Sequence, residues 1–123
     1  MQTSILVVDD DPDILELMSC ILQEQNFTVT PANSGESGLS ILEDTEFEIV
    51  ITDCIMPGIQ GKEFVHAVKS KNPSQRIIAI SASSNALDLL DAIQAGANNV
   101  ITKPIKEECL LEAVEVNLLA EFS

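Results

Sequence analysis

The chain has 123 residues, 46% of them hydrophobic, so it is long enough to bury one ordinary core and too short for two domains. Six Lys and Arg against twenty Asp and Glu give a formal net charge of −14, which argues against direct nucleic acid binding. No signal peptide and no apolar stretch of membrane-spanning length is visible, so we expect a cytoplasmic protein without membrane contact.

The chain has three cysteines, Cys20, Cys54 and Cys109, and a single histidine, His66. No pair of cysteines has the C-x-x-C spacing, which argues against a structural zinc site. The odd count predicts reduced, buried thiols in a reducing compartment. We expect His66 to lie on the surface. Cys54 has no histidine base nearby in the sequence, so a thiol nucleophile is not expected there.

Short apolar runs alternate with stretches of helical spacing in the first half of the chain. Branched residues over Ile5–Val8 predict a strand, which ends where Asp9 begins an acidic run. Asp11 and Pro12 suit the N-cap and the first position of a helix. The elements predicted next are, in order, that helix with Ile14, Met18, Ile21 and Leu22 inward, a strand over Phe27–Thr30, a helix opened by Ser34 with Leu39 and Leu42 inward, and a strand over Glu48–Thr52.

The same alternation continues in the second half. Met56, Pro57 and Gly58 predict a loop. Gly96 is expected to end a helix as its C′ residue. The elements predicted here are, in order, a helix over Lys62–Lys71 with Phe64, Val65 and Val68 inward, a strand over Arg76–Ile80, a helix over Ala86–Ala95, a strand over Asn99–Thr102 and a helix over Glu107–Ala120.

Five strands and five helices in strict alternation predict one fold class. The strands are nearly continuous apolar runs, as expected where helices cover both faces of a sheet. The intervening helices require parallel crossovers. The sequence therefore predicts a single α/β domain over residues 1–123, with a doubly wound, five-stranded parallel sheet.

Polar side chains follow four of the predicted strands. Asp9 and Asp10 follow the first strand, Asp53 the third, Ser81 the fourth and Lys103 the fifth. Chemistry in a doubly wound sheet sits beyond the carboxyl ends of its strands, so these groups should converge on one rim. Each alone has a plainer interpretation, as a helix cap or a turn residue, but those do not explain the joint placement.

Three carboxylates close together repel one another, and a hard divalent cation removes that repulsion. Oxygen ligands with room for water suit Mg²⁺. A carboxylate can attack a phosphoryl group to form an acyl phosphate, and catalysis is then mainly positioning and charge neutralisation. Lys103 and Ser81 would supply a cation and a hydroxyl donor to the phosphoryl oxygens.

The residues that carry a family resemblance are Ile5–Pro12, Asp53 with Met56, Pro57 and Gly61, Ser81 with Ala82, and Lys103 with Pro104. Together they closely resemble the receiver domains of two-component response regulators, over nearly the whole chain. The resemblance implies a flavodoxin-like sheet with strand order 2-1-3-4-5. It also implies a phosphorelay module that catalyses its own phosphorylation and dephosphorylation and is otherwise no enzyme.

The resemblance assigns the magnesium ligands. Asp9 and Asp10 resemble the acidic pair that holds Mg²⁺, with Asp10 favoured as a direct ligand. Asp53 would contribute a carboxylate oxygen, and Ile55 its backbone carbonyl.

It also assigns the phosphoryl site. Asp53 resembles the phosphoacceptor, Ser81 the Ser/Thr switch residue, and Lys103 the lysine that pairs with the phosphoryl group. Pro104 is expected to follow a cis peptide bond, as X-Pro permits.

The implied partners are a sensor histidine kinase or a histidine phosphotransfer protein as donor, and a downstream target or output domain. The implied switch moves the loop at 81–85, the helix at 86–95 and the strand at 99–102, and a phosphorylation-dependent dimer is possible. The last helix has more apolar residues than one face needs, which leaves open a partner face or a broad core face. These residues are Leu110, Leu111, Val114, Val116, Leu118 and Leu119.

Some positions depart from the family pattern. Val100 stands where the family usually has an aromatic switch residue, and Ile105 where it often has Phe. A small aliphatic at Val100 predicts altered or weak coupling between Ser81 and the output face. The two positions that tune dephosphorylation are Ile55 and Ser83, neither of which can orient a water as a carboxylate or amide would. We therefore predict a long-lived phosphoryl state.

Other functions fit the sequence less well. A haloacid-dehalogenase-like phosphatase has an Asp-x-Asp signature that Asp9–Asp11 loosely fits, with Ser81 and Lys103 as later partners. Pro12 stands where that signature needs Thr or Val, and Asp53 is left unexplained. A receiver-like docking module that is never phosphorylated, and a flavin binder, are weaker alternatives. A stand-alone regulator is preferred over a receiver cut from a longer chain.

Overall fold

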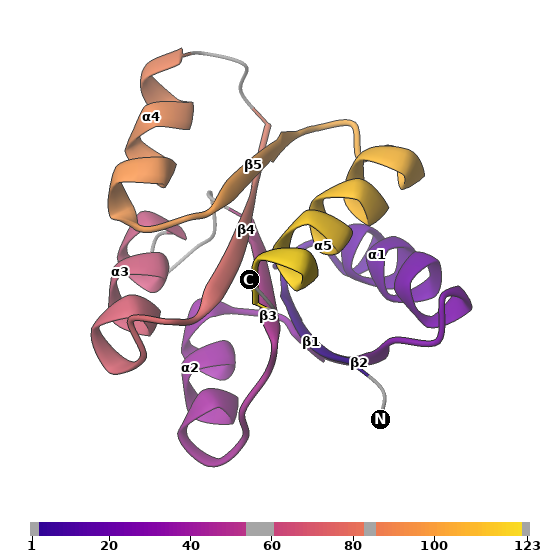
Figure 1. The fold of residues 1–123 in the computed structure, drawn as a ribbon, viewed down its shortest axis with the longest axis horizontal. Helices are drawn as coiled ribbons and strands as arrows, with labels where there is room; N and C mark the ends of the chain where they lie inside the picture. The colour runs from indigo at the N-terminus through magenta and orange to yellow at the C-terminus, as the bar shows by residue number, and fades with distance from the viewer. Residues whose placement is uncertain (1–2, 54–60, 83–85, 122–123) are drawn as a thin grey trace.

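The computed structural model describes residues 3–53, 61–82 and 86–121 (Figure 1). Ten elements alternate along the chain: β1 (Ser4–Val8), α1 (Pro12–Glu24), β2 (Thr28–Ala32), α2 (Gly35–Asp44), β3 (Ile49–Asp53), α3 (Gly61–Lys71), β4 (Arg76–Ser81), α4 (Ala86–Ala95), β5 (Asn99–Thr102) and α5 (Glu107–Glu121). Every predicted strand and helix is present, with bounds that differ by no more than two residues. The predicted loop at Met56–Gly58 lies outside the described residues.

The five strands form one parallel sheet in the order β2-β1-β3-β4-β5. The predicted fold class and strand order are therefore confirmed. From β1 the chain passes to β2 on one side of it, and later to β3 on the other. This reversal makes the carboxyl ends of β1 and β3 the topological switch point, where a ligand crevice is expected.

Helices cover both faces of the sheet, with α1 and α5 on one and α2, α3 and α4 on the other (Figure 1). Side chains alternate along each strand, so Ile5 and Val7 join the core under α1 and α5, whereas Leu6 and Val8 join the core under the other three helices. All four are completely buried. Branched residues on both faces explain the continuous apolar runs.

The helix ends follow the predicted caps. Asp11 is the N-cap of α1, and its side chain accepts a 2.9 Å hydrogen bond from the Asp13 N–H. Ser34 caps α2 in the same way, accepting a 3.0 Å bond from the Ser37 N–H. Gly96 has φ of +128° and follows α4, and its N–H donates to the Ile93 carbonyl at 3.0 Å. A side chain at Gly96 would be strained by that φ, which explains the glycine.

Two predictions about single side chains had opposite outcomes. His66 is exposed on α3, as expected. The predicted burial of the thiols is wrong for Cys20 and Cys109, which are both exposed, while Cys54 lies outside the described residues. Cys20 comes two positions after the buried Met18, about 200° further round the helix, so it faces away from the core. A count of cysteines carries no such information about helix faces.

The apolar residues of α5 divide between two environments. Leu110 and Val114 are completely buried, and Leu111 and Leu118 pack against the same core. Val116 and Leu119 are 47% and 72% exposed. The helix therefore has a broad core face and a smaller exposed apolar surface. No helix in the described part of the chain is long and apolar enough to span a membrane.

Candidate functional site

The predicted site residues lie at the carboxyl edge of the sheet. Asp9 directly follows β1, and Asp53 and Ser81 are the last residues of β3 and β4. Lys103 directly follows β5. Parallel strands bring these four positions to one rim, although they are up to 94 positions apart in sequence.

Three carboxylates form a cluster at this rim. Asp9, Asp10 and Asp53 each offer an oxygen, and these oxygens lie within 4.8 Å of one another. Asp9 and Asp53 are buried, whereas Asp10 is exposed. The cluster therefore has two carboxylates inside the crevice and one at its mouth, open to solvent.

Asp9 is held firmly but is not fully satisfied. Its N–H donates to the Ala32 carbonyl at 3.1 Å, and its Oδ1 accepts a 2.9 Å bond from the Asp11 N–H. Its Oδ2 is buried and has no hydrogen-bond partner among the described residues. Burial raises the pKa of Asp9 to about 6 against the opposing hydrogen bond from Asp11, and the charge of Asp53 raises it further. A buried, unpartnered carboxylate oxygen beside two other carboxylates fits a hard cation such as Mg²⁺.

Lys103 is the cation of the site. Its Nζ lies 3.0 Å from Asp53 Oδ2, and the lysine side chain is 26% exposed. Burial works to lower the pKa of Lys103, but its hydrogen bond to Asp53 and the charges of Asp53, Asp9 and Asp11 outweigh it, so the pKa is raised. The ammonium therefore stays charged and balances part of the negative cluster.

Ser81 is buried beside this pair. Its carbonyl accepts a 2.8 Å hydrogen bond from the Lys103 N–H, and the Lys103–Pro104 peptide is cis, as expected. Strand pairing sets Asp53 opposite Ile80, so Ser81 is one residue further along the crevice. Ile55 and Ser83, to which the sequence assigned a metal ligand and the control of dephosphorylation, lie outside the described residues.

The family model for the response regulator receiver domain matches residues 5–115. The chain belongs to the response regulator receiver domain family. Receiver domains bind Mg²⁺ at an acidic pocket, act with histidine kinases and output domains, and are generally not classical enzymes. The phosphatase and flavin-binding alternatives lose their support.

Relatives of this receiver domain agree. It is 30% identical over 111 residues to the transcriptional regulatory protein GlrR of Escherichia coli K12, covering 90% of this chain but only 25% of GlrR. It is 33% identical to an uncharacterized 14.6 kDa protein of Leptolyngbya boryana, covering 97% of this chain and 92% of that protein. A CheY-like receiver domain structure from Methanospirillum hungatei JF-1 is 27% identical with a TM-score of 0.90, covering 96% and 94% of the two chains.

One polar cluster of this receiver domain escaped the sequence prediction. Asn117 of α5 is completely buried and accepts a 3.0 Å bond from Arg76 Nε. Its amide donates to Asn99 Oδ1 and to the Ala113 carbonyl, both at 2.7 Å. The available sequence signal was an asparagine in a helix rich in apolar residues. Its side-chain partners, Arg76 and Asn99, are the first residues of β4 and β5, so only the tertiary structure reveals the cluster.

Proposed function

We propose that this receiver domain accepts a phosphoryl group on Asp53 from a phosphohistidine donor, in a reaction that depends on Mg²⁺. The observation that carries the proposal is the 3.0 Å pair of Lys103 and Asp53 beside the Asp9 and Asp10 carboxylates. The donor would be a sensor histidine kinase or a histidine phosphotransfer protein. We further propose that residues 1–123 act as one cytoplasmic domain, alone or within a longer regulator.

Asp9, Asp10 and Asp53 would hold the metal, with the backbone carbonyl of Ile55 as a further ligand. The unpartnered Oδ2 of Asp9 and the mutual repulsion of the three carboxylates support this assignment. When bound, Mg²⁺ would neutralise negative charge on the carboxylates and on the phosphoryl oxygens.

The transfer forms one bond and breaks one. A carboxylate oxygen of Asp53 bonds to phosphorus, and the bond between phosphorus and the donor imidazole nitrogen breaks, so the electron pair returns to the donor. Lys103 would pair with the phosphoryl oxygens. The Ser81 hydroxyl would donate a hydrogen bond to them, which links the phosphorylated site to β4 and the start of the segment that follows it.

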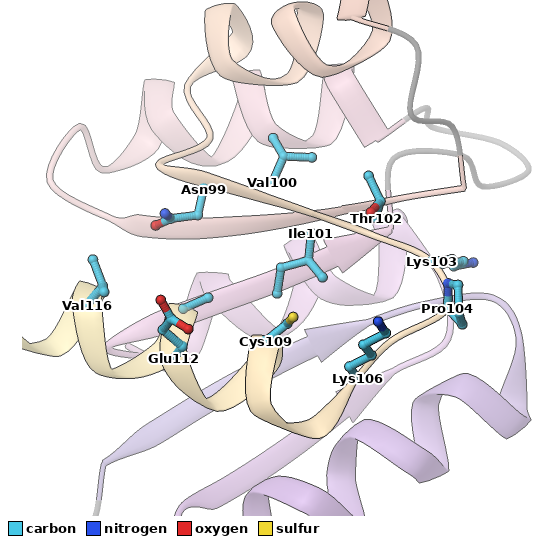
Figure 2. A pocket seen from close by; sticks show the side chains of 11 residues that line it. Asn99, Val100, Ile101, Thr102, Lys103, Pro104, Lys106, Cys109, Glu112 and Val116 are labelled. Atoms are coloured by element: carbon cyan, nitrogen blue, oxygen red, sulfur yellow. The ribbon is translucent and has the colours of Figure 1, made fainter.

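Phosphorylation would change the face formed by α4, β5 and α5 and so control which partner binds there. A groove of about 450 Å³ lies between β5 and α5 on this face. Figure 2 shows Cys109, Glu112 and Val116 along its α5 wall. Ile101 lies on the α5 side of β5, whereas Val100 lies on the α4 side and packs against that core (Figure 2). A downstream target, an output domain or a second receiver would bind this face, and the small Val100 side chain would limit how strongly Ser81 controls it.

The test is phosphorylation with acetyl phosphate, read as intact mass with and without Mg²⁺. We expect an adduct of one phosphoryl group that requires the metal and is absent from the Asp53→Asn variant. An adduct that persists in that variant would place the acceptor elsewhere. No adduct despite measurable Mg²⁺ binding would support a docking module, and absence of both would refute the assignment of the acidic cluster.

A further inference from the structure

A second groove lies far from the phosphorylation site, between the C-terminal ends of α2 and α3. Its volume is about 580 Å³. Gln75, which lines it, directly precedes β4, so the groove lies at the amino edge of the sheet, opposite Asp53 and Ser81. Leu39, Leu42 and Val68 form its floor, and Glu43, Asp44 and Glu46 form its α2 wall.

The floor of this α2–α3 groove is largely apolar and packs on the core. Val68 is 3% exposed and belongs to the core, and Leu39 and Leu42 are half-buried against that same core. Gln75 is also buried, and its amide donates to the Phe47 carbonyl at 3.1 Å. The floor is therefore preformed, and an apolar side chain that enters it loses its contact with water without disturbing the fold.

The α2 wall of the groove is strongly negative. Glu43, Asp44 and Glu46 are all exposed, and the last turn of α2 carries no basic residue. Glu43 and Asp44 thus lie at the negative end of the helix dipole, where carboxylates are unfavourable. Within the described part of the chain Lys71, on the other wall, forms no ion pair with them. Among the residues that the structure describes, no ion pair offsets this unfavourable local charge.

We propose that the α2–α3 groove docks a basic amphipathic segment of a partner protein. Apolar side chains of the segment would occupy the floor over Leu39 and Leu42, and its lysines or arginines would face Glu43, Asp44 and Glu46. Charge complementarity selects this occupant over a second copy of the chain, because two molecules of net charge −14 would bring acidic walls together.

This surface is separate from the proposed output face and from the acceptor. A partner bound there leaves the crevice at Asp53 open, so docking and phosphorylation can take place on the same molecule. The groove would recruit a basic partner whether or not the receiver is phosphorylated. Binding should therefore be the same for the wild type and for Asp53→Asn, with or without Mg²⁺.

The test uses the intact chain and a synthetic amphipathic helical peptide of leucine and lysine, at a salt concentration near 0.15 M to screen unspecific attraction. Amide chemical shifts recorded during the titration identify the bound surface. A peptide of equal charge with serine in place of leucine tests the apolar floor. We expect shifts centred on the C-terminal halves of α2 and α3, and clearly weaker binding of the serine peptide.

A charge-reversal pair supplies the second arm. Glu43→Lys with Glu46→Lys should weaken binding about tenfold or more. Glu24→Lys with Glu115→Lys makes the same change in net charge at exposed positions on α1 and α5, and should leave most of the affinity intact. Equal losses in both pairs, equal binding of both peptides, or shifts on another face would overturn the proposal. These outcomes leave the assignment of Asp53 untouched.

Discussion

Lys103 Nζ lies 3.0 Å from Asp53 Oδ2, which makes an ion pair between a residue that follows β5 and the last residue of β3. The ammonium thus contacts the carboxylate that we propose as the nucleophile. In this state Lys103 neutralises part of the acidic cluster, and it is already in position to meet an incoming phosphoryl group. This contact would therefore give Lys103 two roles, in metal binding and in phosphorylation, which measurements on one variant can distinguish.

Replacing Lys103 by Met should have opposite effects on metal binding and on phosphorylation. Without the ammonium the three carboxylates lose their only close cation among the described residues, so Mg²⁺ affinity should rise several-fold. The phosphoryl oxygens lose their partner, so the rate of adduct formation from acetyl phosphate should fall at least tenfold. Calorimetric Mg²⁺ titration and intact mass measure the two effects. Unchanged affinity and rate would show that Lys103 does not act on the site.

Asp9 should make the stability of the metal-free protein depend on pH. Its pKa is raised to about 6 in the folded state from an ordinary 3.8, so between these values the folded state holds a proton that the unfolded state has released. The free energy of unfolding should therefore fall as the pH rises from about 4 to 6, and stay lower above that. Asp9→Asn keeps the acceptor for the Asp11 N–H and should stabilise the metal-free protein at pH 7 by about 2–3 kcal/mol.

Urea unfolding at a series of pH values with a chelator present measures this effect. Glu16→Gln, an exposed carboxylate on α1, is the matched control and should keep the slope of the wild type. Saturating Mg²⁺ should oppose this loss of stability and stabilise the protein most above pH 6, because the metal binds the ionised carboxylate. An unchanged slope in Asp9→Asn would show that another group is responsible.

The phosphorylated state should be long-lived. Neither Ile55 nor Ser83 has a carboxylate or amide that could orient an attacking water, and both lie outside the described residues. Introducing an amide by Ile55→Asn should shorten the lifetime of the adduct about tenfold or more, because a positioned water attacks faster. Decay of the phosphoryl adduct after removal of acetyl phosphate, followed by intact mass in Mg²⁺ buffer, gives the lifetime. Rapid decay of the wild type would refute the prediction.

Asn117 should contribute strongly to stability. Asn117→Ala leaves Arg76 Nε, Asn99 Oδ1 and the Ala113 carbonyl without their present partner, in a setting that is at least partly buried. We expect a loss of about 2–4 kcal/mol in the free energy of unfolding, and faster amide exchange in α5. Glu115→Ala on the exposed face of the same helix is the control and should cost well under 1 kcal/mol. A similar loss in both would mean that the amide has no special part.

Local sequence signals determined the elements and their ends. The branched runs, the caps at Asp11 and Ser34 and the glycine at Gly96 act within one turn or strand, so local sequence is enough to predict them. Strict alternation of strands and helices then restricts the topology to a parallel doubly wound sheet, and such a sheet brings Asp9, Asp53 and Lys103 to one edge.

The tertiary structure alone decided what depends on contacts between distant segments. Lys103 pairs with Asp53, and Asn117 bonds to Arg76, across separate elements of the fold. The Oδ2 atom of Asp9 lacks a partner because of what packs around it. Sequence periodicity defines which residues share a face, but the energy that orients this face and pairs its polar groups comes from the assembled core.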